Sequence, residues 1–139
     1  MKPLFGYGTF RKTAWRDRIL GFAYTAQPAT LRGYRRVALT SGYLSLRETL
    51  FDVGLVNGTL IELDAIGWEI ADRWEEVPKY RRVDVVVNTM GGPAEATTYI
   101  CSDDVEATPV DDDRFALIAD AAVEASIREF EMVVRIMRG

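Results

Sequence analysis

Hydrophobic and polar positions alternate in short runs through the first hundred residues, and closely spaced turn signals separate these runs. The runs are rich in Val, Leu, Thr and Tyr, which favour strands. They predict strands at residues 4–7, 29–39, 43–46, 53–63, 80–88 and 95–101. We therefore expect a compact, β-rich body.

Two helices interrupt the strands. Residues 11–20 predict a short helix that ends at Gly21. A second helix begins after Asp64, a suitable N-cap, and Pro78 stops it. Its apolar positions recur at helical spacing: Leu63, Ile66, Ile70 and Trp74. The opposite, solvent side carries Glu69, Asp72, Arg73 and Glu76. Glu75 lies at the border of the apolar stripe, where a carboxylate can be half out of water.

The last 29 residues predict a long amphipathic helix at about residues 111–138, with Asp111–Asp113 at its start. Its expected apolar stripe is Phe115, Ile118, Ala122, Ala125, Val133 and Ile136. Its expected solvated face pairs Glu124 with Arg128 and Glu131 with Arg135. The stripe must cover either the open side of the β body or a second subunit, so a homodimer through this helix is one expectation. Glu129 interrupts the stripe, and we interpret it as a carboxylate at the edge of the interface rather than a catalytic group.

Length and composition predict a single domain over residues 1–139, with a body at about 1–103 followed by the helix. The chain has 139 residues, 48% of them hydrophobic, and 17 basic against 21 acidic side chains. The net charge of -4 argues against a dedicated binder of nucleic acid or anionic membranes. A single cysteine, no apolar run of roughly 20 residues and a strand pattern close to Met1 predict a cytoplasmic protein.

The chemistry available to the chain is narrow, because it has no histidine and one cysteine, Cys101. These counts exclude Ser/His/Asp and Cys/His catalysis and zinc sites built from Cys and His. Acid or base catalysis must therefore use carboxylates, Lys or Tyr. We expect no metal and no cofactor.

The run Phe5-Gly6-Tyr7-Gly8-Thr9-Phe10 is the first candidate motif, a strand that breaks into glycine before a helix. Such a corner exposes backbone N–H groups that can hold a carboxylate or an oxyanion. The alternative is a glycine strand end that only turns the chain. A nucleotide loop is not expected, because the third glycine and the Lys-Ser/Thr ending are absent.

The run from Asp72 to Val83 is the second motif, an acidic helix end that leads into an aromatic and basic strand. Glu75 and Glu76 oppose the helix dipole there, so they cost stability unless another factor favours them. The alternative is a solvated helix end with Arg81 or Arg82 as an ion-pair partner.

Taken in order, these motifs resemble the gamma-glutamyl cyclotransferase-like superfamily. The matching segments are Phe5–Phe10, Leu31–Tyr34, Ser41–Leu46, Val56–Leu63 and Asp72–Val87. The resemblance implies an α+β fold, a small mixed β-barrel with surrounding helices, to which the long C-terminal helix is added. It also implies a pocket between the loop of the first strand and a glutamate on the helix.

Members of this superfamily release 5-oxoproline from gamma-glutamyl amines or peptides, and the substrate's own α-amine attacks its γ-carbonyl. The resemblance gives Glu75 the role of base and then acid. The loop at Tyr7, Gly8, Thr9 and Phe10 would hold the substrate carboxylate or the oxyanion, and Tyr80 would line the same pocket. In an apolar setting, the pKa of Glu75 should be raised.

Two departures from the family pattern are visible. Glu76 stands where the family usually has glycine, so it competes with Glu75 as the working carboxylate, and Leu44 stands where proline is usual. A catalytically silent relative that binds a small amino-acid-like metabolite is therefore the alternative function. A third class is a nucleic-acid module built from the basic and aromatic side chains Arg32, Arg35, Arg36, Arg81, Arg82, Tyr34 and Tyr80, against which the net charge argues.

Overall fold

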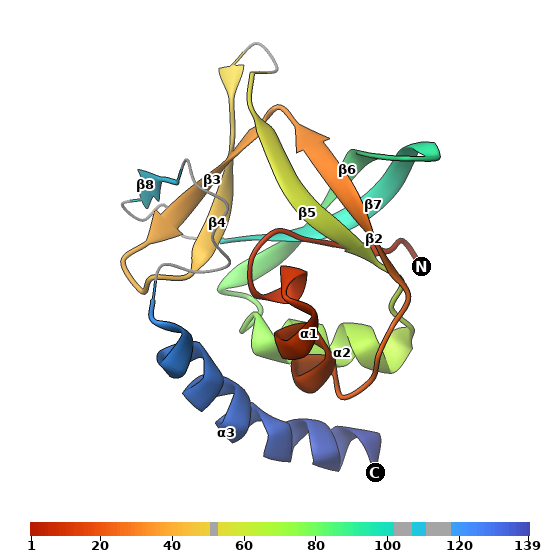
Figure 1. Cartoon of the computed structure of the whole chain (residues 1–139), viewed down its shortest axis with the longest axis vertical. Helices are drawn as coiled ribbons and strands as arrows, with labels where there is room; N and C mark the ends of the chain where they lie inside the picture. Colours follow the sequence, from red (N-terminus) through yellow and green to blue (C-terminus); the bar gives the residue numbers. More distant parts are fainter. Residues whose placement is uncertain (51–52, 102–106, 111–117) are drawn as a thin grey trace.

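The computed structural model describes residues 1–50, 53–101, 107–110 and 118–139. Five strands form a closed barrel in the order β1-β5-β2-β6-β7 (Figure 1). Their bounds are β1 Leu4–Gly6, β5 Leu55–Ile61, β2 Ala26–Arg32, β6 Tyr80–Thr89 and β7 Gly92–Cys101. β1 runs antiparallel to β5 and parallel to β7, so the barrel is mixed.

A second sheet of three strands stands beside the barrel in the order β4-β3-β8. Its strands are β4 Leu44–Glu48, β3 Tyr34–Leu39 and β8 Ala107–Pro109. The helices are the 3-10 turn η1 Thr9–Arg11, α1 Thr13–Leu20, α2 Ala65–Trp74 and α3 Asp120–Arg138. Figure 1 shows the three α-helices gathered on one side of the strands. The predicted α+β architecture, a mixed barrel with helices and a C-terminal helix, is confirmed.

The strand predicted at residues 29–39 is two strands in different sheets. Gly33 separates β2 from β3 with a φ of 85°, a left-handed conformation that favours glycine. The apolar pattern continues across this glycine, so periodicity alone gave one long strand. β8 was not predicted, and the bounds of the other strands differ from the predicted ones by a few residues.

The two early helices follow the capping signals. The Asp64 side chain accepts a hydrogen bond from the Gly67 amide at 2.9 Å, as its predicted N-cap role requires. α1 ends at Gly21, whose φ is 67° and whose amide bonds to the Asp17 carbonyl. The predicted helix at 11–20 is a 3-10 turn followed by α1, because the chain straightens at Lys12.

The predicted C-terminal helix is wrong in its start and in its phase. α3 begins at Asp120, because residues 118 and 119 are not helical, while Asp111–Asp113 and Phe115 lie outside the described residues. The side chains that α3 buries are Val123, Ile127 and Val134, with Phe130 and Met137 partly buried. Of the predicted stripe, Ala122, Ala125 and Ile136 are exposed, whereas Ile118 and Val133 are half-buried.

α3 packs against α1 and α2 of the same chain, so its buried stripe is covered within the molecule. The glutamates assigned to a solvated face, Glu124 and Glu131, instead pair with Arg18 of α1 at 3.8 and 2.7 Å. The larger side chains of the buried stripe explain this phase, because they remove more apolar area from water.

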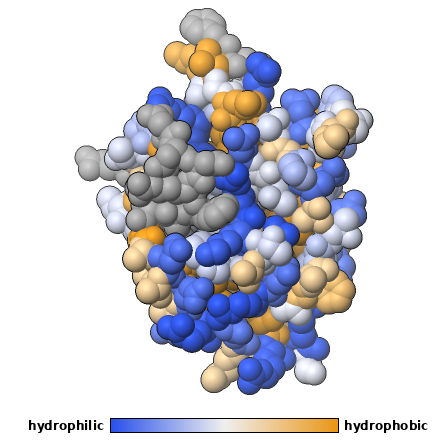
Figure 2. All heavy atoms as spheres, viewed as in Figure 1, coloured by the Kyte–Doolittle hydropathy of each residue, from blue (hydrophilic) through white to orange (hydrophobic). Residues whose placement is uncertain are grey.

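Hydrophobic side chains form two clusters. One joins β1 and parts of other strands to the helices, and the other lies between β1 and further strands of both sheets. β1 contributes to both, because Leu4 and Phe5 point to opposite sides and neither is exposed. In the view of Figure 2, hydrophilic side chains cover most of the α3 side, with scattered hydrophobic ones between them. None of the helices in the described ranges combines the length and apolar character needed to cross a membrane.

Candidate functional site

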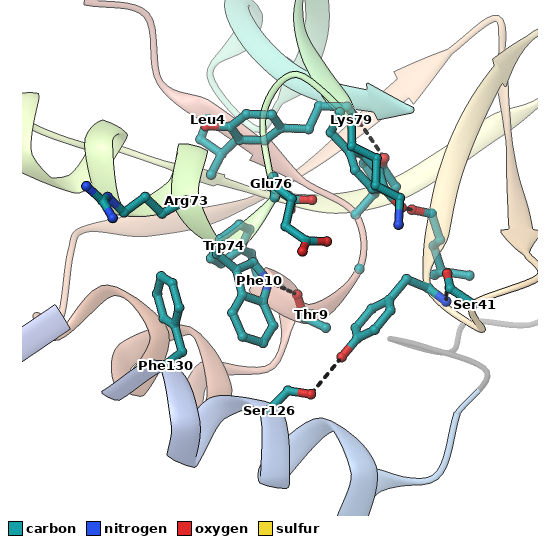
Figure 3. A pocket seen from close by; sticks show the side chains of 18 of the residues that line it. Leu4, Thr9, Phe10, Ser41, Arg73, Trp74, Glu76, Lys79, Ser126 and Phe130 are labelled. Atoms are coloured by element: carbon teal, nitrogen blue, oxygen red, sulfur yellow. Dashed lines mark hydrogen bonds between the residues drawn. The ribbon is translucent and has the colours of Figure 1, made fainter. Parts of the chain in front are cut away.

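A pocket of about 390 Å³ opens where the loop after β1, the end of α2 and the middle of α3 meet (Figure 3). All six predicted site residues line it: Tyr7, Gly8, Thr9, Phe10, Glu75 and Tyr80. They come from two segments that are far apart in the sequence, residues 7–10 and 75–80, and the barrel with its attached helices brings them together.

The loop after β1 is held by contacts that leave its amides free. The N–H groups of Gly8, Thr9 and Phe10 have no hydrogen-bond acceptor among the residues that the structure describes. Gly6 permits the tight approach that this loop needs, because a Cβ there would lie 2.8 Å from the Cβ of Phe10. The Thr9 hydroxyl accepts a hydrogen bond from Trp74 Nε1 at 3.2 Å, which ties the loop to α2.

Two buried arginines stand behind this loop. Arg16 donates to the Phe10 carbonyl at 3.0 Å, and Arg36 lies 3.5 Å from the Tyr7 carbonyl. Both side chains are buried. Their positive charge adds to that of the free amides, so the loop suits an anionic group or a developing oxyanion.

Glu75 is the C-cap of α2, and its amide bonds to the Ala71 carbonyl at 2.9 Å. Its side chain is half-buried and lines the pocket. Burial raises the pKa of Glu75 to about 8, and the charge of Glu76 adds to the increase. A carboxyl with this pKa can both accept and release a proton near neutral pH.

Glu76 lies on the same side of the pocket, but its backbone has a left-handed conformation. Its φ is 54°, and the Val77 amide bonds to the Asp72 carbonyl at 3.1 Å while the Glu76 amide bonds to the Arg73 carbonyl. This is a Schellman motif, in which the left-handed position usually holds glycine. Its side chain is exposed.

The acidic helix end is compensated at Asp72. The sequence named Arg81 or Arg82 as an ion-pair partner of this end, and Arg82 takes that place. Arg82 binds Asp72 with two hydrogen bonds, rather than pairing with either glutamate. The positive charge of Arg82 offsets the negative charge of Asp72 at the helix end, where acidic groups oppose the dipole.

The hydroxyls of the two predicted pocket tyrosines are occupied. Tyr80 donates to the Leu44 carbonyl at 2.9 Å, and Tyr7 donates to the Tyr99 carbonyl. Burial raises the pKa of both phenols, and the charge of Glu75 raises it further. Both rings therefore line the pocket as neutral groups. Leu44 accepts this hydrogen bond with its backbone carbonyl, so the proline that is usual in the family at this position could accept it equally well.

Sequence reasoning missed one wall of the pocket. α3 contributes Ser126, Glu129, Phe130 and Val133, and the β3–β4 connection contributes Ser41 and Tyr43. Figure 3 shows Ser126 and Phe130 facing the cavity. The Tyr43 hydroxyl lies 3.5 Å from the Ser126 hydroxyl. The Phe130 ring packs edge-on against the Trp74 ring. Glu129 is an exposed residue of this wall. The sequence marked Glu129 and Val133 only as parts of the helix stripe. It could not place them at the pocket, because their part of the wall exists only through the packing of α3.

The remaining candidate chemistry is limited. Within the described segments, no three His, Cys, Asp or Glu side chains cluster closely enough to hold a metal ion. Of the side chains considered for nucleic-acid stacking or phosphate contact, Arg36 and Tyr80 are buried and Arg82 is engaged by Asp72.

The sequence profile of a known family, described as gamma-glutamyl cyclotransferase, AIG2-like, matches residues 4–117. The chain belongs to this family. The match contains the loop, Glu75 and Tyr80, and it ends before α3. None of the curated proteins compared with the chain shows significant sequence similarity to it.

Solved structures of other proteins share the fold. A protein from Arabidopsis thaliana is 26% identical, with a TM-score of 0.64 over 99% of this chain and 79% of its own. A gamma-glutamyl cyclotransferase is 12% identical, with a TM-score of 0.63 over 99% of this chain and 84% of its own. An AIG2-like protein from Mus musculus is 16% identical, with a TM-score of 0.54 over 73% of this chain and 78% of its own. At the lower identities the likeness establishes the fold alone.

Proposed function

We propose that this chain releases 5-oxoproline from a γ-glutamyl amine or peptide, with Glu75 as the proton-transfer group. The observation that carries the proposal is the placement of a half-buried carboxyl, with its pKa raised to about 8, in the same pocket as the free amides of the Gly8 loop. Membership of a cyclotransferase family supports the same reaction class.

The proposed chemistry needs one proton carrier and one anion site. Ionised Glu75 takes a proton from the substrate α-ammonium, and the freed nitrogen attacks the γ-carbonyl carbon to close a five-membered ring. The loop amides stabilise the oxyanion or hold the substrate carboxylate, which keeps the chain folded for attack. Glu75 returns the proton to the leaving nitrogen as the old C–N bond breaks. The ring nitrogen then loses its surplus proton, and the released amine takes it up.

The experiment is incubation of the protein with a panel of γ-glutamyl dipeptides, γ-glutamylamines and glutathione, with 5-oxoproline release as the readout. We expect wild type to release 5-oxoproline from at least one substrate, and Glu75→Gln to lower kcat by about 100-fold or more, because the amide cannot accept the proton. Glu69→Gln, an exposed change on the same helix, is the control that should retain wild-type turnover.

Two outcomes would contradict the assignment. Equal release by wild type and Glu75→Gln removes Glu75 from the reaction. Loss of turnover in Glu76→Gln alone moves the role to the neighbouring carboxylate.

The alternative function is a silent relative that binds a small amino-acid-like metabolite in the same pocket. The departures at Glu76 and Leu44, which both line the pocket, favour it over other non-catalytic functions. It predicts ligand binding by calorimetry that survives Glu75→Gln, with no 5-oxoproline from any substrate of the panel.

A further inference from the structure

Asp72 is held by two strands of the barrel at once. Its carboxylate accepts hydrogen bonds from Arg82 Nε at 2.9 Å and Nη2 at 2.7 Å, both from β6. It also accepts a hydrogen bond from the hydroxyl of Tyr99 in β7. A bidentate guanidinium pair fixes direction as well as distance, unlike a single surface ion pair. We call these three residues the Asp72 clamp.

The clamp acts on the part of α2 that carries Glu75. Asp72 lies three residues before Glu75, so both stand in the last turn of the helix. Its backbone carbonyl also accepts the Val77 amide of the Schellman motif that ends α2. A carboxylate tied to the barrel at this point fixes the last turn against the strands.

Tyr99 extends the same contact to the substrate loop. Its hydroxyl donates to Asp72, and its backbone carbonyl accepts the hydroxyl of Tyr7. Arg82 is itself oriented, because its guanidinium lies 4.5 Å from the centre of the Trp68 ring on α2. One set of contacts therefore connects the helix end, two strands and the loop.

We propose that Asp72, Arg82 and Tyr99 are positioning residues that hold the Glu75 carboxyl and the Tyr7 phenol in one fixed arrangement in the pocket. The proposal rests on the proposed function for its catalytic meaning, but the geometry that it claims can be measured without turnover. Asp72 and Arg82 are not among the residues that line the pocket, whereas Tyr99 is. The role proposed for all three is to hold other groups in place.

The test measures the pKa of Glu75 directly by NMR, with carbon-13 labelled glutamate carboxyls assigned by comparison with Glu75→Gln. Release of the last turn exposes Glu75 to water, so we expect Arg82→Gln and Tyr99→Phe each to lower its pKa by about one unit or more. Removing the positive charge of Arg82 would by itself raise that pKa. A fall in Arg82→Gln therefore reports movement and not direct electrostatics.

The charged and titratable groups that face Glu75 are Glu76 on its own segment, Tyr7 on the loop, Tyr80 on β6 and Tyr99 on β7. All of them remain in Arg82→Gln. In the activity assay we expect both variants to lower kcat about 10- to 100-fold, with KM changed less than about threefold, because misplaced groups lose rate more than binding.

Asp84→Asn is the matched control. Asp84 is two residues from Arg82 on β6, where it pairs with Lys2 at 3.0 Å and accepts from Thr97 at 3.1 Å. The Asp84→Asn substitution breaks an ion pair that lies away from the pocket. We expect it to leave the Glu75 pKa and kcat at wild-type values.

Folded Arg82→Gln and Tyr99→Phe proteins with the wild-type Glu75 pKa and kcat would overturn the positioning role. Should Arg82→Gln fail to fold, Tyr99→Phe decides alone, because it removes one hydroxyl and no charge. If no substrate is turned over by wild type but the pKa falls as expected, the proposed function fails and the positioning role stands.

Discussion

Folding buries the Glu75 carboxyl, and burial raises the free energy of its charged form. Its folded pKa of about 8 lies above the ordinary value of 4.5. Below the ordinary value both states are protonated and the penalty is absent. As pH rises between these values, the unfolded state loses its proton first. The free energy of unfolding therefore falls by about 1.4 kcal/mol for each pH unit in this range.

Glu75→Gln should therefore be more stable than wild type at pH 8.5, with a gain that shrinks as pH falls towards 4.5. Urea unfolding at several pH values measures it, and Glu69→Gln, exposed on the same helix, should change stability by less than about 0.5 kcal/mol. A gain that does not vary with pH would contradict the raised pKa. Stability given up at one residue for reactivity is common at functional sites.

Glu76 carries a backbone cost of a different kind. A φ of 54° is unfavourable for a residue with a Cβ by about 1–2 kcal/mol, whereas glycine adopts it freely. Part of that difference is offset, because glycine loses more freedom on folding.

Glu76→Gly should raise the free energy of unfolding by about 0.5–1 kcal/mol. It should also lower the pKa of Glu75, because the charge of Glu76 helps to raise it. Denaturant unfolding checks the first result. Glu69→Gly, within the same helix, should instead destabilise by about 1 kcal/mol; a loss of stability in both variants would show that the left-handed position carries no cost.

At the scale of elements, α3 decides how the pocket is closed. Two apolar stripes can be drawn on its sequence, and only one is buried. Ile127 has no exposed surface, whereas Ile136 is 75% exposed. The pair gives a matched comparison, because residue type and helix are the same.

Ile127→Ala should destabilise the protein by about 2–5 kcal/mol, because it leaves a cavity between α3 and the other helices. Ile136→Ala should change stability by less than about 0.5 kcal/mol. Urea unfolding distinguishes them. Similar losses in the two variants would mean that the exposed stripe is also covered, for example by a second subunit in solution.

At the scale of the whole molecule, the barrel closes only because β5 passes close to β1. Gly58 of β5 faces the buried ring of Phe5, and a Cβ there would lie 2.5 Å from the ring atoms and 2.7 Å from the Gly6 carbonyl oxygen. Because Gly6 ends β1 and begins the loop that lines the pocket, this approach also sets where that loop lies.

Gly58→Ala should lower the free energy of unfolding by about 1–3 kcal/mol, because the ring or the strand must shift. Gly91→Ala is the control, since its nearest neighbour would be the Thr89 hydroxyl at 3.7 Å. Denaturation curves compare the two. A neutral Gly58→Ala would mean that the barrel has room to spare at this crossing.

The candidate site could be predicted in part. The glycine loop and the acidic helix end were visible because each is a local break in a pattern: Gly8 interrupts a strand, and two glutamates end a helix against its dipole. Arg82 was named as a partner of the helix end, but its choice of Asp72 over the two glutamates was not visible, since that depends on how β6 lies against α2. Nor was the α3 wall, because Ser126 and Phe130 reach the pocket only through helix packing.

The sequence by itself determined the alternation of strands and helices, the caps at Asp64 and Gly21, and the absence of histidine chemistry, because these depend on neighbouring residues and on composition. The tertiary structure alone decided that Gly33 splits one apolar run between two sheets, which face of α3 is buried, and that Glu75 loses water. Each of these depends on contacts between segments distant in the chain, and the free energy of burial is defined only once those segments have met.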